Sequence, residues 1–203
     1  MESKFTNIYN KSVWGKREDG KGSSGTGSNI SPDIKFYINL LMNIINENNI
    51  KTICDIGCGD WQFSKTIDWT GLNYTGIDCV SSVIDFNKEN YSQENIKFMK
   101  GDARDIPEGY DLVILKDVIQ HWNDEEIKYI LPKIIEKNKF VFLGNGDKFG
   151  RTPNNNNWQE RKLDKIYHYH PIDIHKKPMN EIQFNLLSTT HRRYKQFNLI
   201  QKV

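Results

Sequence analysis

The sequence predicts a doubly wound α/β domain built around a mostly parallel sheet. Short apolar segments of strand type alternate with amphipathic segments of helical period along most of the 203 residues. The segment 110–115 is almost continuously apolar, which is typical of a strand buried on both faces of a parallel sheet. The segment 52–56 runs directly into a glycine turn. At this length a single domain can bury its own core.

Helix and strand signals follow one another along the chain. Ser31-Pro32-Asp33 combines a cap, a proline and an acid, and it precedes apolar residues at helical spacing up to Ile45. After the first strand we expect a short helical stretch over 61–67. The other expected strands cover residues 73–78, 96–100, 110–115 and 139–143, and a further helix starts near Ser81.

The glycine turn restricts the ligand that it can bind. Gly57 and Gly59 allow positive φ and close backbone approach where the first strand ends. Asp55 and Asp60 make the turn negative, which disfavours a pyrophosphate. The third glycine of the dinucleotide fingerprint is replaced by Gln62. The turn therefore favours a small cationic ligand.

Asp78 ends the strand at 73–78, about twenty residues beyond the glycines, where α/β folds place a ribose-binding carboxylate. The alternative is that Asp78 only caps the helix starting near Ser81.

This order of motifs resembles class I S-adenosylmethionine (SAM) dependent methyltransferases, whose first motif is an acid, any residue, Gly, any residue, Gly. The resemblance implies a Rossmann-like sheet of seven strands that is closed by a C-terminal antiparallel pair at 182–187 and 194–203, around a His-Arg-Arg turn. It implies SAM as cofactor and S-adenosylhomocysteine as product, with Asp102 accepting from the adenine amino group. The implied cofactor-binding residues are Asp55, Gly57, Cys58, Gly59, Asp60, Asp78, Cys79, Asp102, Ala103 and Lys116.

The segment 116–122 resembles the methyltransferase motif at the tip of the fourth strand, where cofactor and substrate meet. His121 is the favoured catalytic base and Asp117 the second candidate, one helical turn apart if a helix starts there. Alternatively the His-Trp pair only caps and packs, and Asp117 orients the cofactor. The candidate acceptor contacts are Trp122, Asn145, Asp147, His170 and Asp173.

Residues 1–30 precede the domain expected over 31–203. Composition alone predicts a flexible Gly/Ser-rich tail. The string Ser24-Gly25-Thr26-Gly27-Ser28, however, resembles an N-terminal segment of one small methyltransferase group, and that resemblance implies a lid over the cofactor. The segment 169–179 resembles a second motif of the same group, but His170 stands where that group has arginine, so an anion contact cannot simply be transferred.

The methyl acceptor is less well defined. No Asp-Pro-Pro-Tyr or Asn-Pro-Pro-Tyr string follows the fourth strand, which argues against base methylation by the usual route. We expect a hydroxyl or amine of a sugar, nucleotide-sugar or glycan, by analogy with the group's likeness to enzymes of glycan metabolism. From Arg151 onward the sequence contains ten Lys or Arg and only four Asp or Glu, so this region is basic. The alternatives are therefore RNA or protein methylation through this basic region, or a non-catalytic SAM-binding subunit.

Cys54, Cys58 and Cys79 form an odd set at predicted strand tips, which predicts reduced thiols rather than a disulfide framework. No metal site is expected, because no His lies near them in sequence. The chain has no apolar run long enough for a bilayer and no secretory signal. We expect a cytoplasmic protein without a membrane partner. The Asn-rich composition suggests an AT-rich genome, and if that genome is a large DNA virus, the location is the host cytoplasm.

Overall fold

The computed structural model describes residues 2–105, 108–147 and 170–203. The chain divides into two compact units, Met1–Asp105 and Ile106–Val203. The N-terminal segment 1–30, predicted to precede the domain, is thus part of the first unit.

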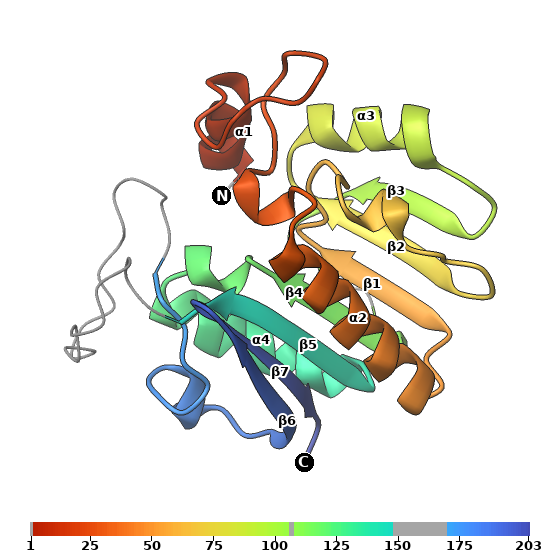
Figure 1. Ribbon diagram of the computed structural model, residues 1–203. Coiled ribbons are helices and arrows are strands. Elements are labelled where there is room, and N and C mark those ends of the chain that lie inside the picture. The colour runs from red at the N-terminus through yellow and green to blue at the C-terminus, as the bar shows by residue number, and fades with distance from the viewer. Residues whose placement is uncertain (1, 106–107, 148–169) are drawn as a thin grey trace. The chain divides into compact units, whose positions relative to one another are not determined.

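The first unit holds three parallel strands and three helices. The strands are β1 (Thr52–Ile56), β2 (Asn73–Asp78) and β3 (Ile96–Lys100), with β2 between the other two. The helices are α1 (Glu2–Asn10), α2 (Pro32–Glu47) and α3 (Ser81–Tyr91), and α3 packs against β2 and β3 (Figure 1). All three strands have the predicted bounds, because their apolar residues and flanking turn residues agree on the same limits.

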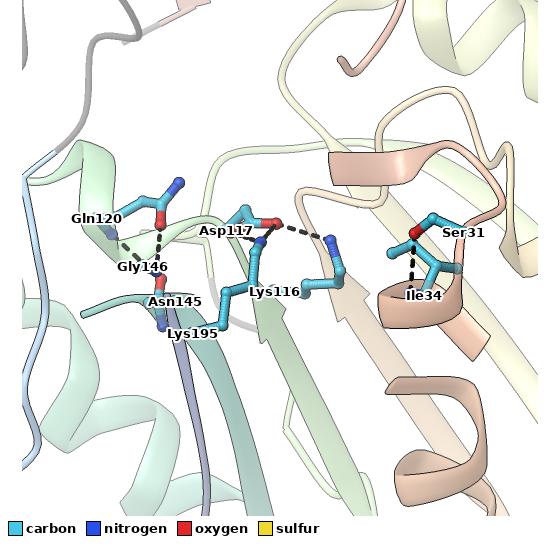
Figure 2. Close-up of polar contacts among 8 residues, drawn as sticks. All are labelled: Ser31, Ile34, Lys116, Asp117, Gln120, Asn145, Gly146 and Lys195. Carbon is cyan, nitrogen blue, oxygen red and sulfur yellow. Dashed lines mark hydrogen bonds and ion pairs between the residues drawn. The ribbon is translucent and has the colours of Figure 1, made fainter. Parts of the chain in front are cut away.

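Helix α2 begins as its sequence predicts. The Ser31 hydroxyl accepts a hydrogen bond of 3.2 Å from the Ile34 amide, and Pro32 occupies the first turn (Figure 2). The helix buries one apolar face, made of Ile34, Tyr37, Leu41, Ile44 and Ile45.

Over its described residues, 108–147 and 170–203, the second unit holds four strands and the helix α4 (Asp124–Lys137), which packs against β5. Strand β4 (Leu112–Lys116) is parallel to β5 (Phe140–Gly146). Strand β7 (Lys195–Gln201) pairs antiparallel with β5 and with β6 (Asn185–Arg192). Helix α4 starts at a capping box. The Asn123 side chain accepts a hydrogen bond from the Glu126 amide (2.8 Å), and the Glu126 side chain accepts one from the Asn123 amide (2.9 Å).

The strand order is β3-β2-β1 in the first unit and β4-β5-β7-β6 in the second (Figure 1). Seven strands, mostly parallel with an antiparallel pair at the C-terminus, confirm the predicted fold class. No helix in the described ranges is long and apolar enough to cross a membrane.

Several local predictions differ from the structure. Strand β4 covers 112–116 rather than 110–115, and β5 covers 140–146 rather than 139–143. The stretch 61–67 contains only a 3₁₀ turn over Ser64–Thr66. Strand β6 starts at Asn185 rather than at 182, since residues 179–181 form another 3₁₀ turn. The predicted His-Arg-Arg turn is also shorter than expected, because His191 and Arg192 still pair in β6 and the chain reverses at Arg193, which has φ 53°.

The N-terminal segment also differs from the flexible tail that its composition predicts. Residues 2–10 form α1, whose Phe5 and Tyr9 pack with Trp14 and with Val80 and Val83 at the start of α3. The glycine-rich composition of residues 15–28 concealed this, because the apolar residues that anchor the segment lie before the glycines.

Candidate functional site

The glycine turn after β1 has the backbone form that its sequence predicts. Gly57 and Gly59 have φ of 75° and 56°. The amides of Gly57 and Cys58 donate to the Ile77 carbonyl at 2.7 and 3.0 Å, which holds the turn beside the end of β2. A Cβ on Gly59 would lie 2.2 Å from the Ser24 hydroxyl. Glycine is therefore required at 59 for both φ and space.

Asp78 lies at the end of β2 as predicted. One carboxylate oxygen accepts from the Gly59 amide (3.1 Å) and the other from the Val80 amide (2.9 Å). Burial raises the pKa of Asp78, although these backbone amides act against that rise. A carboxylate offers about four acceptor positions, so two amides leave capacity for two ribose hydroxyls. The structure does not support the capping alternative, since the N-cap residue of α3 is Val80, that helix start has no side-chain cap hydrogen bond, and Asp78 accepts from the amide of Val80 itself.

Asp55 has a partner inside the sheet. It is 8% exposed, and its carboxylate accepts a 2.6 Å hydrogen bond from the Tyr74 hydroxyl. Burial and the Asp55 charge both raise the pKa of Tyr74, so this hydroxyl stays protonated and keeps donating. The structure therefore gives Asp55 an anchoring role in β1, and its predicted contact with the cofactor stays a prediction.

The three cysteines are free thiols, as predicted. Burial, followed by the charges of neighbouring carboxylates, raises the pKa of Cys79 to about 12 and that of Cys58 well above its usual value. Both thiols are neutral near pH 7. They can line a cofactor site as small weakly polar groups, without nucleophilic chemistry.

Asp60 is 1% exposed and is held by the N-terminal segment. Its Oδ2 accepts from the Ser24 amide (3.2 Å) and from the Gln62 side chain (2.7 Å), while its own amide donates to the Ser24 hydroxyl (2.9 Å). Its Oδ1 is buried without a hydrogen-bond partner in the described part of the chain. A buried carboxylate with one unsatisfied oxygen fits a cationic ligand group.

Asp102 follows β3 as predicted, but the structure gives it an ion pair. The Arg104 guanidinium donates to both carboxylate oxygens at 2.8 and 2.7 Å. These bonds lower the pKa of Asp102, so it is ionised. Ala103 is buried beside it. Adenine contact by Asp102 stays a prediction, and it would use the acceptor positions that Arg104 leaves.

In the second unit the tip of β4 carries a charge cluster. Asp117, with φ 60°, contacts the ammonium group of Lys116 at 2.7 Å and that of Lys195, which arrives from the start of β7 (Figure 2). Burial alone would raise the pKa of Asp117, but the two lysine charges outweigh it and hold the pKa well below its usual range. An anion this stable is a weak base, so Asp117 suits positioning better than proton removal.

Asp117→Asn is expected to lower the free energy of unfolding by about 2 kcal/mol near pH 7, because it leaves two lysines without their shared carboxylate. The folded-state pKa lies below the unfolded value of about 3.9, so this stabilisation is complete above that pH and is lost as the pH falls through the folded pKa. Urea unfolding between pH 7 and 2.5 would measure it. Parallel stability curves for the two proteins would contradict the ion pair, and Asp85→Asn, at an exposed site on α3, is the control.

No α-helix starts at Asp117. A single 3₁₀ turn, Ile119–His121, follows instead, so the predicted helical spacing of Asp117 and His121 is wrong. The left-handed backbone of Asp117 turns the chain before the helix can begin. His121 is half-buried, whereas Trp122 is 1% exposed and belongs to the core. The prediction that Trp122 contacts the substrate is therefore corrected to a packing role.

Several of the other predicted acceptor contacts have structural partners. Asn145 is 2% exposed and accepts from the Gln120 amide, and Gln120 in turn accepts from the Gly146 amide (Figure 2). The His170 amide donates to the Gln120 carbonyl at 2.6 Å. Asn145 is thus corrected to a loop-holding role, since its amide is buried among protein partners.

Asp147 and Asp173 differ from each other. Asp173 caps its own turn by accepting from the His175 amide at 3.0 Å, and lies 3.6 Å from the Lys176 ammonium. Asp147 is buried, with one oxygen 3.4 Å from the His191 ring and the other without a partner among the described residues. Of the two, Asp147 retains the unsatisfied acceptor that a substrate donor could use.

Sequence reasoning missed the residues that come from distant segments. Tyr9 and Ser24 reach the glycine turn, Asn87 donates to the Gly59 carbonyl at 2.7 Å, and Lys195 reaches Asp117. For Lys195 a signal existed, because an antiparallel partner of β5 brings its first residue to the carboxyl end of that strand. The sequence carried no comparable signal for Asn87.

Comparison with known proteins agrees with this geometry. Residues 53–137 match the family model described as a methyltransferase domain. The matched stretch includes the glycine turn, Asp78, Asp102 and the tip of β4. The predicted resemblance is therefore supported for the domain, whereas the N-terminal motif and the sugar-methylating group remain expectations.

Relatives and solved structures extend this similarity. The chain is 28% identical over 141 residues to ubiquinone biosynthesis O-methyltransferase of Rickettsia bellii, covering 64% of this chain and 57% of that protein. It is 26% identical over 169 residues to putative methyltransferase 235L of Invertebrate iridescent virus 6, covering 73% and 59%. Magnesium protoporphyrin IX methyltransferase of Synechocystis PCC 6803 has the same fold, with a TM-score of 0.64 at 16% identity over 100% of this chain and 97% of that one. The chain spans less than two thirds of the length of the first two relatives.

Proposed function

We propose that this protein is a SAM-dependent methyltransferase that acts on an oxygen or nitrogen of a small polar molecule. The observation that carries the proposal is the buried Asp78 carboxylate at the tip of β2, bonded to the Gly59 amide within the matched methyltransferase domain. Such a carboxylate binds ribose hydroxyls in α/β folds. The Synechocystis neighbour was solved with bound SAM and, separately, with bound SAH, which further supports SAM as the cofactor.

The first unit suits the charges of this cofactor. SAM supplies an activated methyl group on a sulfonium, so the protein has to bind, orient and, for a hydroxyl acceptor, remove a proton. Asp78 has remaining acceptor positions for the ribose, and Asp60 has an unpartnered oxygen for the ammonium group. The neutral thiols of Cys58 and Cys79 add no competing charge.

For the proton, His121 remains the proposed base, and Asp117 takes the positioning role. The lowered pKa of Asp117 leaves it a poor acceptor of a proton near pH 7. An imidazole titrates in the useful range.

The acceptor is proposed to be a hydroxyl of a sugar, nucleotide-sugar or glycan, with an amine as the second choice. Similarity to proteins named as O-methyltransferases favours oxygen: one acts in ubiquinone biosynthesis, and a structural neighbour is named mitomycin 7-O-methyltransferase. The choice of a sugar rests on the small size of the domain and on the resemblance of the segments 24–28 and 169–179 to a methyltransferase group that is similar to enzymes of glycan metabolism.

The test is calorimetric titration with SAM and SAH, followed by a tritiated-methyl transfer assay on panels of nucleotide-sugars, glycans, RNA and protein. Micromolar binding and transfer to a sugar hydroxyl are expected. Transfer to RNA or protein, lost steeply with salt, would replace the proposed acceptor. Binding without transfer to any panel would favour a SAM-binding subunit, and absence of binding would refute the cofactor.

A further inference from the structure

The N-terminal segment, residues 2–30, joins the glycine turn through one serine. Ser24 makes two hydrogen bonds to Asp60, since its amide donates to Oδ2 and its hydroxyl accepts from the Asp60 amide. The same hydroxyl lies 2.7 Å from the Tyr9 hydroxyl. Asp60 is thus held by a segment 36 residues earlier in the chain, and the turn is not complete without it.

The rest of the segment is attached to the first unit by scattered contacts. The Arg17 guanidinium lies 3.7 Å from the centre of the Phe86 ring, and Glu2 pairs with Lys100 at 2.6 Å. Tyr9 packs against Val80 and Val83. Most of residues 10–21 are exposed or half-exposed. Residues 10–21 therefore open locally at low free-energy cost, whereas Ile8, Tyr9 and Ser23 on either side of them are buried.

Closure of this segment leaves Asp60 in an unfavourable state. The side chain is 1% exposed, and its Oδ1 has no hydrogen-bond partner among the described residues. An unsatisfied buried acceptor destabilises the folded state, and a charged one does so more strongly. The surroundings are negative: burial, then the charges of Asp78 and Asp60, raise the pKa of Tyr9 well above its usual value. A cationic donor at Oδ1 would satisfy this acceptor and would also neutralise part of the negative charge.

We propose that the N-terminal segment and the ammonium group of the cofactor bind cooperatively through Asp60. Ser24 is a positioning residue that holds Oδ2, and the ammonium group occupies Oδ1. The inference rests on the proposed function, because it takes SAM as the ligand. By thermodynamic linkage, the free energy by which the bound ammonium group stabilises the closed segment equals the free energy by which closure strengthens cofactor binding.

Two ligands that differ in the amino-acid portion distinguish this coupling from binding of the nucleoside alone. SAH carries the ammonium group, whereas 5′-methylthioadenosine keeps the adenosine and thioether but lacks the amino-acid portion. Both can use Asp78, yet only SAH can reach Asp60 with a cation. We therefore expect SAH to bind at least about tenfold more tightly and to slow hydrogen exchange in residues 11–28, with no slowing by methylthioadenosine.

The experiment is calorimetry and hydrogen–deuterium exchange on the full chain with each ligand. Asp60→Asn keeps an acceptor for the Ser24 amide but removes the charge, so the affinities of the two ligands should converge and protection by SAH should disappear. Ser24→Ala should weaken SAH about tenfold and leave methylthioadenosine unchanged. Ser28→Ala, in the same segment, is the matched control.

The outcomes distinguish failure of the coupling from failure of the cofactor assignment. If neither nucleoside binds, the proposed function is wrong and the inference fails with it. If both bind with equal affinity and protect the segment equally, the cofactor assignment stands and the coupling is refuted. This comparison needs only the wild-type protein, so it is decisive even where a variant does not fold.

Discussion

Replacing Asp78 with Ala is expected to weaken SAM binding by about 100-fold or more. Hydrogen bonds to a charged acceptor each contribute about 1.5–3 kcal/mol, and the cofactor ribose offers two hydroxyls to this carboxylate. Because the pKa of Asp78 is raised by burial, affinity should also fall as the pH is lowered through that raised value. Calorimetric titration at a series of pH values from 8 down to 4 would measure both effects.

The variant needs a control for folding, since Ala removes the acceptor of the Gly59 and Val80 amides. Circular dichroism and thermal unfolding report whether the fold remains. Asp85→Ala removes an exposed acid from α3 and should leave SAM affinity unchanged. Retained micromolar affinity in a folded Asp78→Ala protein would place the ribose elsewhere.

The second large effect is expected for Gly59→Ala. The residue has φ 56°, where an L side chain costs about 1–2 kcal/mol, and its Cβ would lie 2.2 Å from the Ser24 hydroxyl. The Ser24 hydroxyl must then move, which breaks its bond to the Asp60 amide and loosens the N-terminal segment. We expect a loss of at least about tenfold in SAM affinity and faster proteolysis within residues 11–28.

Gly71→Ala is a matched control because it separates backbone strain from the clash. Gly71 has φ 75°, and a Cβ there meets nothing within 4 Å. Both variants should lose similar stability through φ, but only Gly59→Ala should release the segment. Equal proteolysis of the two variants would show that the Ser24 contact does not hold the segment closed.

Strands and turns were the most predictable parts of this protein. Strands β1, β2 and β3 have the bounds predicted from their apolar pattern, and Asp78 ends its strand where the spacing predicted. The helix start at Ser31 was equally clear, because cap, proline and acid act within one turn. Signals of this kind depend on neighbouring residues, so the sequence shows them directly.

The interpretation of the strand-tip side chains was less successful. Trp122 and Asn145 were predicted to contact substrate, but both are buried among protein atoms. A sequence indicates which residue type follows a strand. It does not indicate whether that side chain points outward or into the core, because this depends on which other segments pack around it.

The sequence by itself thus determined the fold class, the limits of the first three strands and the position of the Gly57, Gly59 and Asp78 group. These follow from local periodicity and spacing. Only the tertiary structure showed Ser24 on Asp60, Lys195 on Asp117, and the oxygen of Asp60 that has no partner. Such pairings join residues 36 and 78 positions apart, and they depend on how the chain folds back rather than on any local pattern.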